Sequence, residues 1–263
     1  MSLQIKRYQV DAFADRVFEG NSAVVCPLEK WLPDEVMQNI AMENNLAETA
    51  FYVNEPEGLR IRWFTTTTEV LLCGHATLAT AFVLFFHEGH QGDTIKFNSL
   101  SGPLSVTKSD TLLTLNFPVD KFNEVPAMSE LEKALGAKAL QTFKGKTDYM
   151  LVFDREEIIQ NMIPDLTQIA KVKARGIIVT AKGKQVDFVS RFFDPQSGGG
   201  EDPVTGSAHT TLTPYWSNVF GKTELNAKQL SKRGGNLHCK LLGDRVAIAG
   251  TAKLFSTGTI YLN

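Results

Sequence analysis

Apolar and polar residues alternate along many short segments of this chain, which is the pattern of half-buried β-strands. The segments with this pattern lie at residues 5–13, 22–26, 51–54, 59–64, 94–98, 104–108, 112–117, 149–153, 177–180, 186–193, 236–242, 245–249 and 252–257. Short polar turns such as Gly243-Asp244 separate the later segments, as expected of hairpins. The pattern therefore predicts a chain rich in antiparallel strands.

A different pattern marks the helices. Residues 33–44 begin with Pro33-Asp34-Glu35 and carry an i, i+4 apolar stripe, which predicts an amphipathic helix. Residues 76–86 are apolar on nearly every side, which predicts a helix that is buried all round. A similar helix is expected over 207–220, interrupted or started late by Pro214. Shorter helices are expected at 129–135 and 165–172. Strands surround both apolar helices in sequence, which favours a sheet curved around each.

Two parts of the chain resemble each other. Arg62, Glu69 and Cys73-Gly74 precede one central helix, and Arg191, Glu201 and Thr205-Gly206 precede the other, about half a chain length later. This repeat predicts a duplicated architecture. We place the first lobe at residues 1–118 and the second at 119–251.

Composition narrows the class of protein. The 263 residues are 43% apolar and 21% charged, as in a globular protein with an adequate core. The net charge of −2 gives no reason to expect nucleic acid or an anionic membrane as a partner. Three widely spaced cysteines do not form a disulfide framework and favour a reducing, cytoplasmic setting. The N-terminus has no signal-peptide pattern, and residues 76–86 are too short to span a bilayer.

Glu48 is the first candidate for chemistry. It lies at a helix-to-strand corner, with no other charged residue between Asn44 and Asn54. If enclosed, a lone carboxylate has its pKa raised by desolvation, which suits it to proton transfer near neutral pH. The alternative, an exposed surface glutamate, is the more common case.

Cys73-Gly74-His75 falls at a loop-to-helix junction, where backbone N–H groups point outward. The thiol is a candidate base or nucleophile, and His75 a candidate proton carrier or helix cap. A buried inert cysteine beside a capping histidine is the alternative. The repeat favours the functional interpretation, because Cys73 matches Thr205 and His75 matches Ser207.

The stretch from Gly198 to His209 combines glycines, carboxylates and hydroxyls ahead of a helix. Asp202 and Ser207 are its functional candidates. For Glu201, and for Glu69 in the first half, we expect a structural role close to a helix N-terminus. The histidines and cysteines lack zinc spacing, and the glycines lack the phosphate-loop and dinucleotide patterns, so no metal or nucleotide cofactor is predicted.

Taken together, these residues are similar to the PhzF-like (phenazine biosynthesis-like) isomerase family, within the diaminopimelate epimerase-like fold. The motifs that carry the resemblance are Asp11-Ala12-Phe13 with Gly20-Asn21, Asn45 to Phe51, Arg62 to Thr65, Cys73 to Thr77, Arg191 to Phe193, Glu201 to His209 and Arg233-Gly234-Gly235. They extend over nearly the whole chain. Thr66, Leu230 and Ser22 depart from the family pattern in loops, which leaves substrate choice open.

The resemblance implies an α+β fold of two pseudo-symmetric domains, each a curved, mostly antiparallel sheet wrapped around a central helix, with residues 252–263 returning to the first domain. It implies a site between the domains, with Glu48 as general acid/base, His75, Asp202 and Ser207 as polar partners, and Gly74 and Gly206 as N–H donors to a substrate carboxylate. It also implies no metal, no cofactor and a homodimer.

These observations predict a cofactor-independent isomerase that acts on a small carboxylate. Two alternatives stay open. One is an epimerase or dehydratase of an amino or imino acid that uses Cys73 and Thr205, although a threonine at position 205 argues against a two-thiol racemase. The other is a non-catalytic small-molecule binding protein.

Overall fold

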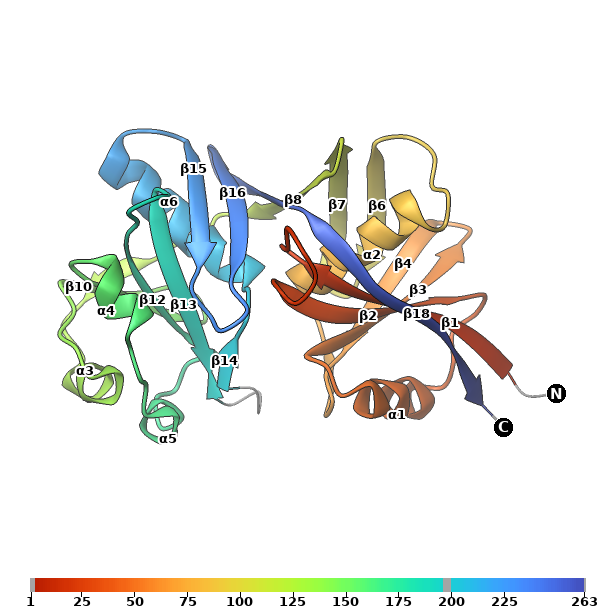
Figure 1. Cartoon of the computed structure of the whole chain (residues 1–263), viewed down its shortest axis with the longest axis horizontal. Helices are drawn as coiled ribbons and strands as arrows, with labels where there is room; N and C mark the ends of the chain where they lie inside the picture. The colour runs from red at the N-terminus through yellow and green to blue at the C-terminus, as the bar shows by residue number, and fades with distance from the viewer. Residues whose placement is uncertain (1–2, 196–199, 263) are drawn as a thin grey trace. The chain divides into compact units, whose positions relative to one another are not determined.

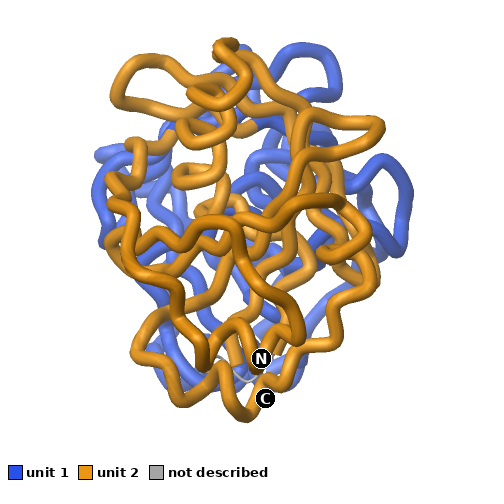
Figure 2. The backbone as a smooth tube through the Cα atoms, turned by 90° about the vertical axis from the view of Figure 1, so that its left-hand side faces the viewer, with its two compact units in different colours: residues 1–116, 249–263 blue, residues 117–248 orange. Residues whose placement is uncertain are grey.

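The computed structural model describes residues 3–195 and 200–262 (Figure 1), so Gly198 and Gly199 of the predicted site lie outside the described residues. The chain divides into two compact units (Figure 2). Unit 1 comprises Met1–Asn116 and Ala249–Asn263, and unit 2 comprises Phe117–Ile248. Both combine a mixed sheet with few helices.

The helices and strands expected for the first half of the sequence are present, and β5 (Glu69–Val70) is an additional short strand. The elements of unit 1 are β1 (Leu3–Ala12), β2 (Asn21–Leu28), α1 (Asp34–Asn44), β3 (Glu48–Glu55), β4 (Gly58–Phe64), β5, α2 (Gly74–Phe86), β6 (Thr94–Ser99), β7 (Gly102–Ser109), β8 (Leu112–Pro118, which ends in unit 2) and β18 (Ala252–Leu262).

Helix α2 is the centre of unit 1 and packs against β1, β2, β3 and β18 (Figure 1). Nearly all of its residues are buried, as its apolar sequence predicts. The two threonines on it tolerate burial because Thr77 Oγ1 donates to the Cys73 carbonyl at 2.5 Å and Thr80 Oγ1 donates to the Ala76 carbonyl at 2.8 Å. A second cluster, which includes Met37 and Phe51, fixes α1 on the sheet.

Unit 2 contains more short elements than the sequence pattern predicts. They are β9 (Asn123–Val125), α3 (Ser129–Leu135), β10 (Gln141–Lys144), β11 (Tyr149–Val152), α4 (Glu156–Gln160), α5 (Leu166–Ile169), β12 (Ile177–Lys182), β13 (Phe188–Asp194), β14 (Gly200–Asp202), η2 (Gly206–Ala208), α6 (His209–Phe220), β15 (Glu224–Gln229), β16 (Gly235–Leu242) and β17 (Arg245–Gly250, which ends in unit 1).

Two helix predictions need correction. Helix α5 is only four residues long, shorter than the predicted 165–172. Asp165 caps its start by accepting from Gln168 N–H, and after it the N–H groups of Lys171 and Val172 bond carbonyls three residues back, so the α-helix does not continue. Pro214 lies inside α6 and does not interrupt it. The helix starts late for another reason: residues 206–208 form the tighter turn η2 first.

Strand pairing repeats between the units. In unit 1 the pairs β1–β2, β3–β4 and β6–β7 are antiparallel, and β2–β3 and β4–β6 are parallel. In unit 2 the pairs β10–β11, β12–β13 and β15–β16 are antiparallel, and β11–β12 and β13–β15 are parallel. The same alternation in the same order shows that the sequence repeat reflects a duplicated fold.

The last strand, β18, completes unit 1. It pairs antiparallel with β1 from Leu3 opposite Leu262 to Ala12 opposite Ala252. The first and last strands are therefore neighbours in this sheet (Figure 1). Among the described residues, no helix combines the length and apolar character needed to cross a membrane.

Candidate active site

Glu48 is the first residue of β3 and is held there by the end of α1. Asn45 ends that helix in the left-handed conformation (φ 49°), and its N–H donates to the carbonyls of Ala41 and Met42. The chain then enters β3, which pairs parallel with β2 and sets Ala23 opposite Glu48. The Glu48 side chain is only 18% exposed, so it is not the surface glutamate that its residue type favours.

Cys73 and His75 come from the start of α2. Cys73 is the N-cap residue, with an extended backbone (φ −142°), and Gly74 opens the helix. His75 is the second residue of the first turn, and both side chains are buried. Local sequence and helix geometry therefore place a thiol and an imidazole beside N–H groups that have no partner within the helix.

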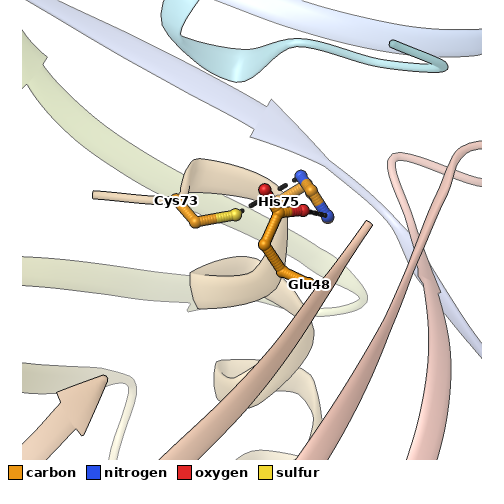
Figure 3. Close-up of side chains that lie close together, drawn as sticks. All are labelled: Glu48, Cys73 and His75. Carbon is orange, nitrogen blue, oxygen red and sulfur yellow. Dashed lines mark hydrogen bonds and ion pairs between the residues drawn. The ribbon is translucent and has the colours of Figure 1, made fainter. Parts of the chain in front are cut away.

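These side chains meet Glu48 in one cluster (Figure 3). Glu48 Oε2 lies 3.1 Å from His75 Nε2, and these two atoms have no other polar partner among the described residues. On the other side of the ring, Cys73 Sγ lies 3.5 Å from His75 Nδ1. The imidazole thus stands between a carboxylate and a thiol.

The charges in this cluster depend on one another. Burial raises the pKa of the Cys73 thiol, and the charge of Glu48 raises it further, so the thiol stays protonated near neutral pH. Burial acts to lower the pKa of His75, but the contacts with Cys73 and Glu48 outweigh it and raise that pKa well above 6.5. Since the thiol is neutral near pH 7, the Glu48 carboxylate is the charge that favours an imidazolium there.

The same three residues also have the donor set of a metal site, with ligand atoms within 4.8 Å of one another. In the contacts that the structure shows, Glu48 approaches Nε2 and Cys73 approaches Nδ1, so the two groups are bridged by the ring. The arrangement favours proton exchange through the imidazole over a shared metal ion.

Asn21 is a site neighbour to which the sequence analysis gave no role. Its Nδ2 lies 3.2 Å from His75 Nδ1. Asp11 orders the preceding loop by accepting from Phe18 N–H at 3.0 Å and from the Ser22 hydroxyl. The signal was present, because Asp11 and Gly20-Asn21 belong to the motifs that carry the family resemblance.

In unit 2, Asp202 and Thr205 form a second group. Thr205 Oγ1 donates to Asp202 Oδ2 at 2.5 Å. The fully buried Gln229 fixes both residues, because its Nε2 donates to the Asp202 carbonyl at 2.8 Å and its Oε1 accepts from Thr205 N–H at 2.8 Å. Thr205 is the N-cap residue of η2, as Cys73 is of α2, which confirms that the two positions correspond.

Ser207 and Gly206 lie in η2, which continues directly into α6. Arg175 NH1 donates to Ser207 Oγ at 2.9 Å, and the same guanidinium is held by both oxygens of the buried Asp148. No sequence pattern pointed to Arg175 or Asp148, since neither belongs to a motif of the sequence analysis. Together they fix the Ser207 hydroxyl at the start of the central helix.

Glu69 and Glu201 have a structural role, as expected, but the reason given from the sequence was wrong. Each carboxylate binds an arginine through two hydrogen bonds: Arg62 to Glu69 at 2.7 and 2.7 Å, and Arg191 to Glu201 at 2.6 and 3.0 Å. Short strands β5 and β14 bring the pairs together by setting Glu69 opposite Phe64 and Glu201 opposite Phe193. The carboxylates pair with arginines rather than acting on a helix dipole.

The structure therefore gathers the predicted residues into two groups, each described within its own unit. Glu48, Cys73, Gly74 and His75 lie together in unit 1, and Asp202, Thr205, Gly206 and Ser207 lie together in unit 2. His209 is a buried helix histidine whose Nδ1 bonds the Thr205 carbonyl at 2.9 Å.

Known proteins are similar to this chain over nearly its whole length. An uncharacterized isomerase of Pseudomonas aeruginosa is 51% identical over 99% of this chain and 100% of its own length. The human phenazine biosynthesis-like domain-containing protein is 37% identical over 98% of this chain and 99% of its own length.

Solved structures share the fold. A PhzF-family protein of Enterococcus faecalis is 49% identical, with a TM-score of 0.96 over 99% of this chain and 100% of that one. A hydroxyproline epimerase of Agrobacterium vitis, 7% identical, has a TM-score of 0.65 over 98% of this chain and 93% of that one, which is a likeness of fold alone. The fold is thus the α+β, diaminopimelate epimerase-like fold that the motifs predict.

The family described as "Phenazine biosynthesis-like protein" (PhzC-PhzF) matches residues 10–258. Relatives of this family are named isomerases, and this match covers every motif from Asp11 to Arg233-Gly234-Gly235. The chain therefore belongs to the PhzC-PhzF family of phenazine biosynthesis-like proteins, an isomerase-type family.

Proposed function

We propose that this protein is a cofactor-independent isomerase that moves a proton on a small metabolite bearing a carboxylate. The observation that carries the proposal is the largely buried cluster of Glu48, His75 and Cys73. Membership of an isomerase-type family supports the reaction class.

In this mechanism the Glu48 carboxylate takes a proton from a substrate carbon and returns it at another position. The electron pair of the broken C–H bond stays on the substrate as an enolate-like anion until the proton comes back. His75 sits 3.1 Å from Glu48 and supplies compensating charge while the carboxylate is ionised. The site needs no electron acceptor, since the product has the oxidation level of the substrate.

Binding of the substrate carboxylate is assigned to the helix starts. Gly74 opens α2, and Gly206 with Ser207 opens η2 ahead of α6, where backbone N–H groups lack partners within the helix. Asp202, with its carboxylate fixed by Thr205, is proposed to orient the substrate or to carry a second proton. Fixed donors of this kind stabilise charge that develops on an enolate-like state.

The test starts from a screen of carboxylate metabolites for stabilisation of the folded protein. Each compound that stabilises it is then incubated in D2O, and incorporation of deuterium at carbon is followed by NMR. Glu48→Gln should retain the fold and lower the exchange or turnover rate by about 10²- to 10⁴-fold. Glu43→Gln, an exposed glutamate on the neighbouring helix α1, is the control and should behave as wild type.

Turnover of Glu48→Gln within threefold of wild type would remove Glu48 from the mechanism. Binding of carboxylates with no deuterium incorporation in the wild type would instead indicate a non-catalytic binding protein.

A Cys73-dependent epimerase or dehydratase is the second candidate, because Cys73 contacts the second nitrogen of His75. Under this alternative, Cys73→Ala abolishes exchange while Glu48→Gln leaves most of it. If Glu48 is the base, Glu48→Gln abolishes exchange and Cys73→Ala leaves most of it. Cys26→Ala is the matched control, since that cysteine is also buried and free.

A further inference from the structure

Gln229 is a buried polar residue to which the proposed function gives no part. It is the last residue of β15, in unit 2, and it is completely buried. A buried amide without hydrogen bonds is costly, so both polar atoms of this side chain need partners. The partners lie in the segment from Asp202 to Thr205.

Two backbone groups fix the orientation of the Gln229 amide. Its Oε1 accepts from the N–H of Thr205 at 2.8 Å, and its Nε2 donates to the carbonyl of Asp202 at 2.8 Å. A backbone N–H can only donate and a carbonyl oxygen can only accept, so turning the amide over would break both bonds. The side chain therefore has one orientation, with its NH2 group toward the Asp202 carbonyl.

The same NH2 group starts a chain of hydrogen bonds between side chains. Gln229 Nε2 donates to Thr205 Oγ1 at 3.2 Å, and the Thr205 hydroxyl donates to Asp202 Oδ2 at 2.5 Å. Because an amide NH2 group cannot accept, the direction is fixed from Gln229 through Thr205 to Asp202. We call these three side chains the relay.

A relay with this direction favours a negative charge at its end. An ionised carboxylate only accepts, and a hydrogen bond donated to it stabilises its ionised form. A hydroxyl that accepts one hydrogen bond also donates a stronger one. The amide of Gln229 therefore strengthens the bond from Thr205 to an ionised Asp202. The single hydroxyl hydrogen of Thr205 is directed to that carboxylate, and not to a substrate.

The turn from β15 to β16 holds the relay in place. Leu230 N–H donates to the Ser190 carbonyl at 2.7 Å, and Ser231 Oγ donates to the Pro203 carbonyl at 2.8 Å. Pro203 lies between the two ends of the segment that the amide binds, so the turn fixes its middle as well. The relay is thus preorganised by the fold.

Charged side chains also lie near the relay. The charge of Arg175 interacts with those of Asp194 and Asp202. Glu201 precedes Asp202 on β14, so its side chain points to the opposite face, where Arg191 binds both of its oxygens. The variants described below leave all of these groups in place, so their effects on Asp202 are common to every protein compared.

We propose that Gln229 and Thr205 are positioning residues that hold Asp202 as an ionised proton acceptor. This inference rests on the proposed function and chooses between the two roles given there to Asp202, in favour of carrying the second proton. Asp202 takes that proton from the substrate, which keeps the electron pair of the broken bond. It returns the proton in the same turnover, so no co-reactant is consumed.

The test compares Thr205→Val with Thr205→Ser. Valine has the shape of threonine but no hydroxyl, so it interrupts the relay and keeps the backbone N–H that Gln229 binds, whereas serine keeps the hydroxyl. Titration of the Asp202 carboxyl is followed by ¹³C NMR in the full chain. Thr205→Val should raise the proton affinity of Asp202 about tenfold, and Thr205→Ser should leave it within about threefold of wild type.

Thr211→Val is the matched control. Thr211 is also a buried threonine of unit 2, and its Oγ1 donates to another carboxylate, Asp120 Oδ2, at 3.0 Å. The control should lower the Tm much as Thr205→Val does but leave the Asp202 titration unchanged. Gln229→Leu should shift that titration in the same direction as Thr205→Val and add nothing to it in the double variant. If Gln229→Leu does not fold, the two Thr205 variants still decide.

Deuterium exchange links the relay to the reaction. For a carboxylate that exchanges in wild type, the acid limb of the pH–rate profile should move to higher pH in Thr205→Val, by the shift measured for the Asp202 carboxyl. It should stay in place in Thr205→Ser and Thr211→Val.

The proposal is overturned if Asp202 titrates alike in wild type and Thr205→Val, if Thr211→Val shifts it as much, or if the acid limb does not follow the carboxyl. The NMR titration needs no substrate. A wild type without any exchange therefore counts against the proposed function, and with it the role of Asp202 in the reaction, while the titration still supports or refutes the relay.

Discussion

Thr77 and His209 hold equivalent positions at the starts of the two central helices. Thr77 Oγ1 bonds the carbonyl of Cys73, and His209 Nδ1 bonds the carbonyl of Thr205. In each case the acceptor is the N-cap residue four positions earlier. The same backbone contact is made by a small hydroxyl in unit 1 and by a buried imidazole in unit 2, and only the second can titrate.

Stability should fall when the pH drops below 6.5 because of His209. Burial lowers the pKa of His209 to about 4, against 6.5 in the unfolded chain, so between these values the unfolded chain binds the extra proton. The stability present above pH 6.5 is lost as the pH falls toward 4, by on the order of 3 kcal/mol. Urea unfolding at pH 7 and pH 5 measures this change.

His209→Thr provides the comparison, because Thr77 makes the same backbone contact in unit 1. The free energy of unfolding of this variant should be about 2–4 kcal/mol below that of wild type at pH 7, because the smaller side chain leaves a cavity. Its further decrease between pH 7 and pH 5 should be smaller than that of wild type. An equal loss in both proteins would show that other groups cause the acid sensitivity.

The titration of His75 should depend on Glu48. Although burial acts to lower the pKa of His75, the contacts with Cys73 and Glu48 raise it well above 6.5, and Glu48→Gln removes the Glu48 charge. The midpoint for His75 should therefore fall in Glu48→Gln and stay in place in Glu43→Gln. NMR of the histidine ring protons measures it. A midpoint that is the same in wild type and Glu48→Gln would contradict the charge coupling.

This pair also has a pH-dependent effect on stability, with the opposite sign to that of His209. A raised histidine pKa stabilises the fold fully below 6.5, and the contribution is lost as the pH rises through the folded pKa. The unfolding free energy of wild type should therefore decline on the alkaline side more than that of Glu48→Gln.

Gly20→Ala should damage both the fold and the site. Gly20 has φ 67°, and a Cβ there would overlap the Ala12 carbonyl oxygen and lie 2.9 Å from Ala14 Cβ. We expect the free energy of unfolding to fall by about 3 kcal/mol or more, and Asn21 to be displaced from His75. Thermal unfolding and the His75 NMR signals report the two effects.

Gly243→Ala is the matched control for that experiment. Gly243 has nearly the same φ, 66°, but a Cβ at this position would meet no atom within 4 Å. The substitution should lower the free energy of unfolding by only about 1 kcal/mol and leave the His75 NMR signals unchanged. If the two variants were equally stable, backbone conformation alone, and not the contact with Ala12, would explain the need for glycine.

Arg191→Lys should destabilise the protein more than Arg62→Lys. Both arginines bind a glutamate through two hydrogen bonds, but Arg191 also donates to the carbonyls of Ile159 and Met162, whereas the further partner of Arg62 is the exposed Asp34. A lysine cannot reproduce this fork. We expect Arg191→Lys to lower the free energy of unfolding by about 1–3 kcal/mol. In Arg62→Lys, the loss of the Asp34 contact should lower it by less than about 1 kcal/mol. Urea unfolding of both variants gives the order.

Much of the fold could be predicted because its strands and central helices carry strong patterns. The alternation in 94–98 and 104–108 leads directly to β6 and β7, and the apolar run 76–86 to α2. Strands β9 and β14 were not predicted, since three residues are too few to show a period of two. Pro214 misled the prediction because a proline within a helix usually breaks it.

The candidate site was predicted in part. Residue types at the helix starts identified Cys73, His75, Thr205 and Ser207. Partners from distant segments were missed, among them Asn21, Arg175 and Gln229, because their contacts depend on tertiary packing rather than on local pattern. The glutamate pairing was missed for the same reason, since it depends on strand register.

The pairing of β1 with β18 can form only after unit 2 has been translated. Unit 2 is one continuous segment, 117–248, and is complete before the last strand has been made. Strand β1 pairs with β2 and is translated before unit 2, whereas its second partner, residues 252–262, is translated after unit 2. Until then the amino-terminal sheet has an open edge, so a nascent or truncated chain presents β1 to other unpaired strands.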